Sequence, residues 1–340
     1  MDSVRLSLQD AIDLVVRALV TSRVSETNAQ STATALVAAE ADGQKGHGLS
    51  RVPSYAAQAR SGKVDGFATP SYEQPASALL RIDANSGFAY PAVDLACEHL
   101  PSIVAETGIA TACLFNSHHF GQAGAHAERL AKQGLVALVF SNSPKAISFW
   151  GGNEPMLGTN PIAFAAPQTD AEPMVIDLAL SRVARGKILA AQRAGEKIPE
   201  DWALDAAGKP TTDPAAALAG SMLPIGDAKG AALVLMVELL AAAVTGSNFA
   251  YEASSFFDAD GAPPHIGHLM IVIQPDIASR DRFTERMSSI VVAIAHTDGA
   301  RLPGTTRLTR RDQAGNDGLA IPVSLHDEIL SIINSGDSNG

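Results

Sequence analysis

Cysteine and charge are scarce in this chain of 340 residues. The two cysteines, Cys97 and Cys113, stand in apolar stretches. So few thiols argue against a disulfide framework, and no metal-ligand spacing involves either one, so we expect buried free thiols and no metal site. Charged residues make up 18%, with 25 Lys and Arg against 36 Asp and Glu, a net charge of −11. This balance argues against a nucleic-acid partner but does not exclude small anions.

Long hydrophobic runs are also missing. The longest apolar stretch, from Ala231 to Ala243, is interrupted by Glu238 and is too short to cross a bilayer. Residues Met1–Arg5 carry no apolar segment of the kind that a signal peptide needs. We therefore expect a soluble, cytoplasmic protein without a membrane partner.

Common nucleotide and nucleophile motifs are absent too. No Gly-x-Gly-x-x-Gly follows a predicted strand, and there is no P-loop. The nearest candidates, 121–124 and Gly151-Gly152, lack the spacing that wraps a pyrophosphate. Neither a Gly-x-Ser-x-Gly elbow nor a cysteine with activating neighbours occurs. A dinucleotide, if bound, therefore needs a scaffold other than the Rossmann fold.

What the chain does contain predicts a compact α/β enzyme. An apolar content of 46% suits large cores, and the length favours two domains. The periodicity predicts helical ends around a central α/β body, with 196–214 as a loop. Predicted helices cover Leu8–Leu19, a segment from Ser25 to before Gly43, Tyr55–Arg60, Pro91–Glu106, Gly124–Lys132, Ala231–Thr245, Ser279–Ala295 and Ser324–Asn334. Predicted strands cover Ala78–Ile82, Ile109–Phe115, Leu135–Phe140, Ile162–Ala165, Met174–Ile176 and His268–Ile273.

Polar turns among these runs supply the candidate chemistry. His47 lies between two glycines after a helix end, and Arg51 follows four residues later. A histidine with its ordinary pKa of about 6.5 suits proton donation, and an arginine can hold a carboxylate in two hydrogen bonds. A surface loop with two unrelated polar residues is the alternative. His118 and His119 end a strand and point to opposite sides, so they do not favour a shared metal.

Three further positions carry candidate anion sites. Arg185 begins a helix, and Lys229 stands on a glycine turn before the long helix from Ala231. Arg301 and Arg307 lie in a basic, turn-rich loop of an acidic protein. Thr159, in Gly-Thr-Asn-Pro, offers a hydroxyl to a carboxylate or carbonyl.

The ordered motifs Gly46–Arg51, Ser117–Gly124, Leu157–Ala163 and Arg301–Arg307 resemble the malate/L-lactate dehydrogenase-like family, whose NAD(P)H oxidoreductases lack a Rossmann fold. The resemblance implies a homodimer, a central, mainly antiparallel sheet of α/β (α+β) class, a helical substrate and dimer domain from 1–75 plus 277–340, and a cofactor domain from 76–276. It implies His47 as proton donor, with Arg51, Thr159 and His119 binding substrate. The implied cofactor contacts are His119, Phe120, Gly121, Gln122, Ala123, Ser143, Asp177, Leu178, Ala179, Arg185, Lys229, Arg301 and Arg307.

The substrate prediction also comes from this resemblance. The motifs Gly-His-Gly-Leu-Ser-Arg-Val-Pro and Arg-Leu-Pro-Gly are most similar to those of the Δ1-piperideine-2-carboxylate/Δ1-pyrroline-2-carboxylate reductases. Two arginines in the 301–307 loop favour NADPH, with NADH possible. A 2-hydroxy-acid dehydrogenase of malate or lactate type is the alternative. A non-catalytic binder of dinucleotide or imino acid is another, because Gly46 replaces the family's usual serine.

Overall fold

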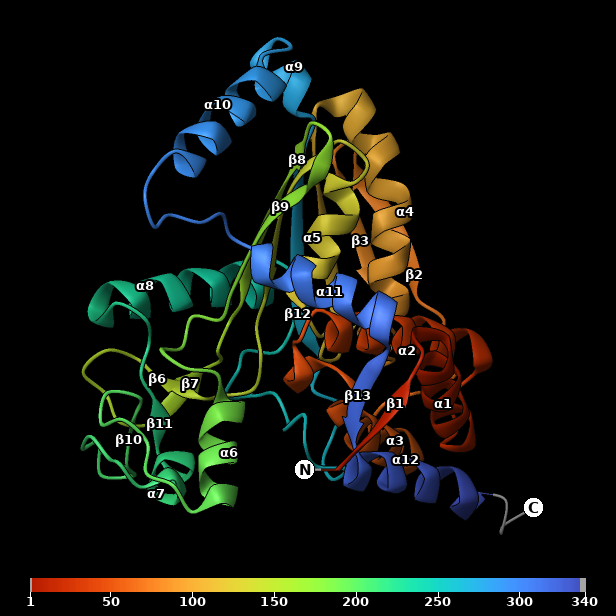
Figure 1. Ribbon diagram of the computed structural model, residues 1–340, viewed down its shortest axis with the longest axis vertical. Helices are drawn as coiled ribbons and strands as arrows, with labels where there is room; N and C mark the ends of the chain where they lie inside the picture. Colours follow the sequence, from red (N-terminus) through yellow and green to blue (C-terminus); the bar gives the residue numbers. More distant parts are fainter. Residues whose placement is uncertain (1, 337–340) are drawn as a thin grey trace.

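The computed structural model describes residues 2–336, and its centre is a seven-stranded sheet (Figure 1). Every neighbouring pair in this sheet is antiparallel except β3 and β4, which confirms the predicted mainly antiparallel sheet. In sheet order the strands are β2 (Ser71–Ala76), β3 (Leu79–Asp83), β4 (Ile109–Ser117), β12 (Ile266–Ile273), β5 (Val136–Ser141), β8 (Ile162–Gln168) and β9 (Ala171–Leu178).

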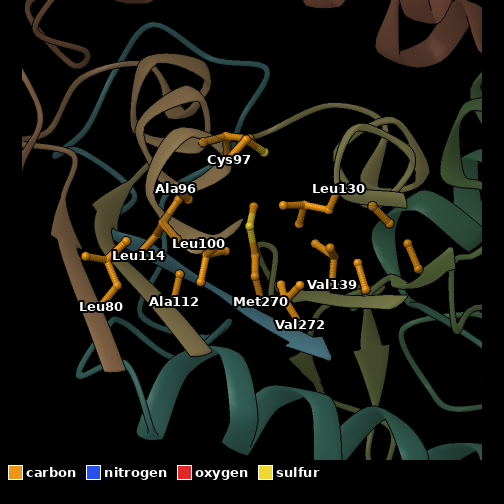
Figure 2. Packing of buried hydrophobic residues seen from close by; sticks show 14 of the residues in the cluster. Leu80, Ala96, Cys97, Leu100, Ala112, Leu114, Leu130, Val139, Met270 and Val272 are labelled. Carbon is orange, nitrogen blue, oxygen red and sulfur yellow. The ribbon is translucent and has the colours of Figure 1, made fainter. Parts of the chain in front are cut away.

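One face of the sheet is covered by α4 (Ala89–Thr107) and α5 (Ala123–Ala131). Alternate strand residues point to this face, since side chains reverse direction at each step along a strand. Figure 2 shows Leu80, Ala112 and Leu114 facing Leu100 of α4, and Val139 and Met270 lying near Leu130 of α5. These side chains are 0–1% exposed. Cys97 lies in the same core, and both cysteines are buried and free, as predicted.

The opposite face is covered by α8 (Asp227–Glu238), which continues as the π-helical turn η3 (Leu239–Ala243), whereas α6 (Arg185–Ala194) packs against the short helix α7 (Pro214–Ala219). Phe140 and Leu269 of the sheet pack here with Val234 and Val237 of α8. A four-stranded sheet and a short helix complete this side: β10 (Ala203–Leu204), β11 (Ser221–Met222), β6 (Ile147–Ser148), β7 (Pro155–Leu157) and α7 (Pro214–Ala219).

The two ends of the chain share one hydrophobic core. Strand β1 (Ser3–Leu6) pairs with β13 (Leu319–Pro322), and α12 (Val323–Gly336) packs on α1 (Leu8–Thr21). Helices α2 (Glu26–Ala41) and α3 (Val52–Ser61) complete the unit. The side chains of Ser7 and Ser25 accept hydrogen bonds from the amides of Asp10 and Asn28, which confirms the predicted helix starts.

Two predictions at the C-terminal end are corrected by the structure. The helix predicted over Ser279–Ala295 is confirmed as α10 (Phe283–Ala295) but begins later, because Arg280 and Asp281 adopt positive φ angles and separate it from α9 (Pro275–Ser279). Helix α10 stands away from the body (Figure 1), outside the core shared by the chain ends. The predicted loop ends at Gly304, where α11 (Thr305–Asp317) begins. The strongly polar sequence of α11 has no apolar stripe to reveal a helix.

A buried network of four charges attaches α11 to the rest of the protein. Arg307 contacts Asp42, at the end of α2, at 3.1 Å and Glu128, on α5, at 2.9 Å. Arg311 contacts the same carboxylates at 2.7 and 2.8 Å. Burial alone would raise the pKa of Glu128, but the hydrogen bonds and charges of Arg311 and Arg307 outweigh it and lower that pKa to about 2. The network therefore stabilises the fold as long as Glu128 is ionised.

Replacing Glu128 by Gln tests this network. Because the folded-state pKa is lowered, the contribution of Glu128 is complete above the ordinary pKa of a glutamate and disappears as the pH falls towards about 2. We expect the free energy of unfolding at neutral pH to fall by about 3 kcal/mol, since buried Arg307 and half-buried Arg311 lose a charged partner. We also expect its pH dependence below about pH 5 to weaken. Urea denaturation across this pH range measures both effects. Glu73→Gln, in an exposed pair with Arg81, is the control; equal pH dependence in both variants would contradict the assignment.

Candidate active site

The candidate residues gather along one edge of the central sheet. Ser117 at the end of β4 lies opposite Ile266, and Ser141 at the end of β5 lies opposite His268. On the other side of β5, Ile162 at the start of β8 lies opposite Leu178 at the end of β9. The turns that follow or precede these residues therefore leave the sheet together. They contain the predicted segments 118–123, 142–145, 159–160 and 177–179.

A chain of hydrogen-bonded rings forms the first part of the site. His47, in the 3-10 turn η1 (Lys45–His47), places Nδ1 3.1 Å from Nε2 of His119, and the two rings stack with centroids 5.1 Å apart. Nδ1 of His119 lies 2.6 Å from the hydroxyl of Tyr55, which is 3.3 Å from that of Tyr90. Burial raises the pKa of Tyr55 to about 12, so its hydroxyl keeps its proton. When Tyr55 donates to His119, Nε2 of His119 donates to His47, and the proton of a neutral His47 is on Nε2. When Nδ1 of His119 donates to Tyr55 instead, Nδ1 of His47 donates to His119, and Nε2 of His47 can accept a hydrogen bond.

Both histidines are neutral at pH 7. Burial, and then the charge of Arg51, lower the pKa of His47 to about 4. The same two causes, with smaller effects of neighbouring histidines, hold the pKa of His119 well below its usual range. His47, the predicted proton donor, is therefore a neutral imidazole and not a charged imidazolium in the ligand-free protein.

Arg51 supplies the positive charge beside these rings. It ends the 3-10 turn η2 (Leu49–Arg51), donates from Nε to the carbonyl of Gly46 at 2.7 Å, and lies 4.6 Å over the ring of Phe257. Its Nη1 atom is buried and has no hydrogen-bond partner among the described residues. A carboxylate would satisfy this donor. A Cβ added at Gly46 would meet nothing within 4 Å, so space does not exclude the serine usual in the family.

A second part of the site joins the turns after β5 and before β8. The amide of Thr159 donates to Oγ of Ser143 at 3.0 Å, and the two hydroxyls are 3.3 Å apart. A Cβ on Gly158 would overlap the carbonyl of Ser143, so this close approach requires glycine. The structure thus brings two predicted residues, one for substrate and one for cofactor, into contact.

Glu238 binds the turns that form this second part of the site, and it was not predicted from the sequence as a site residue. It is 1% exposed and accepts from the side-chain amides of Asn142 at 3.1 Å and Asn160 at 2.7 Å. It also accepts from the backbone of Ala250 at 2.7 Å. In the sequence, Glu238 is only a charged residue within an apolar run. A buried charge of this kind needs hydrogen-bond partners, but the sequence does not identify which residues they are.

The start of α5 forms the third part. Asp177 accepts from the amide of Gly124 at 2.8 Å, and burial raises its pKa. Its carboxylate therefore caps α5 where an anion of a ligand would otherwise bind. Gly121 has a φ of 73°, and the ring of Phe120 stacks on buried His268 at 4.3 Å, so only the backbone of Phe120 can face a ligand.

Arg307 does not have the predicted free charge. Its guanidinium is bound to Glu128 and Asp42, so it cannot serve as an open cation for a 2′-phosphate. Gln122 donates to the same Asp42 at 3.1 Å. Arg301 and Lys229 are exposed, whereas Arg185 is half-buried near Asp258. None of these three cations forms an ion pair with a carboxylate within residues 2–336.

The residues present fit a nicotinamide dinucleotide. Oε1 of Gln122 and Oδ1 of Asn160 are buried acceptors without partners in the described chain, and a carboxamide or a ribose hydroxyl could donate to them. Leu178 is 50% exposed at the same edge and offers an apolar contact, next to exposed Ala179. Ala123 begins α5 and is itself buried.

The described residues contain neither a metal-binding cluster nor a membrane-spanning helix. Within residues 2–336, no group of three or more His, Cys, Asp or Glu side chains is arranged to hold a metal ion. None of the helices in that range combines the length and the apolar character that crossing a bilayer requires.

Comparison with known proteins agrees with the geometry. The family model described as malate/L-lactate dehydrogenase matches residues 6–330. The (2R)-3-sulfolactate dehydrogenase (NADP(+)) of Chromohalobacter salexigens is 50% identical over 95% of this chain and 96% of its own length. A Δ1-pyrroline-2-carboxylate/Δ1-piperideine-2-carboxylate reductase of Pseudomonas putida is 42% identical over 87% of each chain. The crystal structure of the Δ1-piperideine-2-carboxylate reductase of Pseudomonas syringae superposes with a TM-score of 0.92, 37% identity and coverage of 97% and 99%.

The titration of His47 tests this geometry directly. In the ligand-free protein, NMR of ¹⁵N-labelled histidine should show His47 neutral at pH 7, with a pKa of about 4. Arg51→Gln should raise that pKa, because a nearby positive charge is removed, but not to the ordinary value, because burial is the larger cause. Arg193→Gln, an exposed change on α6, is the control. An ordinary histidine pKa in the unaltered protein would contradict the burial of His47.

Proposed function

Because this chain belongs to the malate/L-lactate dehydrogenase family and is an NAD(P)H-dependent oxidoreductase, we propose that it reduces a cyclic imino acid with NADPH. The substrates would be Δ1-piperideine-2-carboxylate or Δ1-pyrroline-2-carboxylate, and the products L-pipecolate or L-proline. The observation that carries the proposal is the buried, unpartnered Nη1 of Arg51 beside a neutral His47. This pair suits a carboxylate attached to a carbon that accepts hydride.

In this proposal the chain binds and orients a planar substrate. Arg51 and the hydroxyl of Thr159 hold the carboxylate, and NADPH, when bound, supplies the hydride. A cyclic imine that enters protonated already carries its proton on nitrogen. His47 then needs only to accept a hydrogen bond from that nitrogen at Nε2, which a neutral imidazole with its proton on Nδ1 can do. A carboxylate bound to Arg51 also offsets the charge that helps to lower the pKa of His47.

A 2-hydroxy acid of the sulfolactate type is the second candidate. It is favoured by the 50% identity to a protein named (2R)-3-sulfolactate dehydrogenase (NADP(+)). In the oxidative direction a neutral His47 would take the hydroxyl proton, so the lowered pKa also suits this reaction. Such a substrate carries a second anionic group, and half-buried Arg185 is a cation without an ion pair in the described chain.

A substrate panel tests the proposal. Purified protein with NADPH should turn over the two cyclic imines faster than sulfopyruvate, oxaloacetate or pyruvate, as followed by the absorbance of NADPH. His47→Ala should lower kcat/KM about 100-fold, because a hydrogen bond to the charged imine nitrogen is lost. Binding of NADPH, measured by fluorescence titration, should be unchanged in this variant.

The other outcomes identify the alternatives. Preference for sulfopyruvate would support the sulfolactate-type reading and leave the family and cofactor in place. Binding of NADPH without turnover of any substrate would support a non-catalytic binder. Faster turnover with NADH than with NADPH would count against Arg301 as a contact of a 2′-phosphate.

We also infer that the protein is a homodimer in which α10 contributes to the interface. Helix α10 has 13 residues, none of them buried, and a helix of this length is marginally stable by itself. Ile277, Ile290 and Val292 are 62%, 51% and 52% exposed near or on it. An apolar surface of this kind usually marks a contact with another chain.

The dimer is tested by light scattering after size-exclusion chromatography. The unaltered protein should have the mass of two chains, and Ile290→Lys with Val292→Glu should shift it to one chain, because buried charges without partners oppose association. Val20→Glu, at another exposed apolar position on α1, should leave the mass unchanged. A monomeric unaltered protein would refute the proposal.

A further inference from the structure

The segment 254–262 lies against the rings of His118 and His119. Contacts from α3 and Lys63 set its position. Phe256 is 6% exposed, and its ring centroid lies 5.3 and 5.2 Å from those of His118 and His119. The next residue, Phe257, is 50% exposed and lies under the guanidinium of Arg51. Two consecutive aromatic side chains of one irregular segment thus contact His119 and Arg51, two of the residues predicted to bind substrate.

Backbone carbonyls of this segment accept hydrogen bonds from the side chains of Lys63, Gln58 and Ser61. The ammonium of Lys63, a residue 2% exposed, donates to the carbonyls of Ser255, Asp258 and Asp260 at 2.7, 2.9 and 2.8 Å. From α3, Gln58 donates to the carbonyl of Phe256, and Ser61 to that of Ala259, both at 2.8 Å.

These contacts determine where the Arg51 guanidinium can lie. A hydrogen bond from Nε to Gly46 fixes one edge of its plane, but rotation about this edge remains open. The ring of Phe257 restricts this rotation, because a guanidinium stacks flat on an aromatic face. With both contacts in place, the unpartnered Nη1 points in one direction.

We propose that Phe257 is a positioning residue for the substrate carboxylate, acting through Arg51, and that Lys63 holds Phe257 in place. The proposal rests on the proposed function, in which Arg51 binds the carboxylate. Phe257 does not itself bind the substrate in this scheme. It limits the orientations of the guanidinium, so that the entropy cost of ordering Arg51 is met before the substrate arrives.

Phe257→Leu keeps an apolar side chain but loses the aromatic face. We expect KM for the substrate with the fastest turnover in the panel to rise about five-fold, with kcat and KM for NADPH unchanged. Phe257→Tyr should restore KM, because it restores the aromatic face. Phe67→Leu, at a phenylalanine that is 64% exposed, is the matched control. Lys63→Met should raise KM in the same way and should add little when combined with Phe257→Leu.

A variant of Arg51 separates failure of this proposal from failure of the proposed function. Arg51→Lys keeps the charge but loses the planar, two-pronged donor, so KM should rise strongly. An unchanged KM in Phe257→Leu with a raised KM in Arg51→Lys would overturn the role of Phe257 alone. Unchanged KM in both variants would overturn Arg51 as the carboxylate ligand and the proposal with it. A fall in kcat and in thermal stability for Phe257→Leu, without rescue by Phe257→Tyr, would assign it a structural role instead.

Discussion

The pairing of β12 with both β4 and β5 is the constraint on which the candidate site depends. Strand β12 comes from residues 266–273, far along the chain, yet it lies between two strands that follow each other in sequence. Its register sets Ser117 and Ser141 at one edge of the sheet. His268 marks this edge by bonding both serines, at 2.9 and 2.8 Å. Without this strand, the turns that carry His119 and Ser143 would not leave the sheet side by side.

Charge is used sparingly around the site, and most of it is paired. Arg307 and Arg311 are bound to carboxylates, and Glu238 accepts from three amide groups. Arg51 differs because, among the described residues, its guanidinium contacts no carboxylate and its buried Nη1 has no hydrogen-bond partner. An uncompensated donor in a low-dielectric setting costs free energy in the empty protein. That cost is recovered when an anion binds, which is how a protein with a net charge of −11 can attract a carboxylate.

Local features of the fold could be predicted from the sequence, and long-range ones could not. The helix starts at Ser7 and Ser25 follow from a hydrogen bond between a side chain and an amide three residues on. The partnership of Tyr55 with His119 spans 64 residues, and no local pattern encodes it. Lys63 binds backbone carbonyls, which every residue possesses, so its partners leave no trace in the sequence. The resemblance to a known family identified His47 and Arg51, but it did not reveal that their neighbours suppress the charge of His47.

The sharing of one core by the two chain ends has a consequence for the order of synthesis. Helix α12 packs on α3, the helix that carries Tyr55 and begins immediately after Arg51, and β13 pairs with β1. The ribosome makes α12 long after α3, so for much of synthesis the helix that carries Tyr55 lacks this packing partner. The growing polypeptide can therefore complete its seven-stranded sheet while the support of α3 by α12 is still missing.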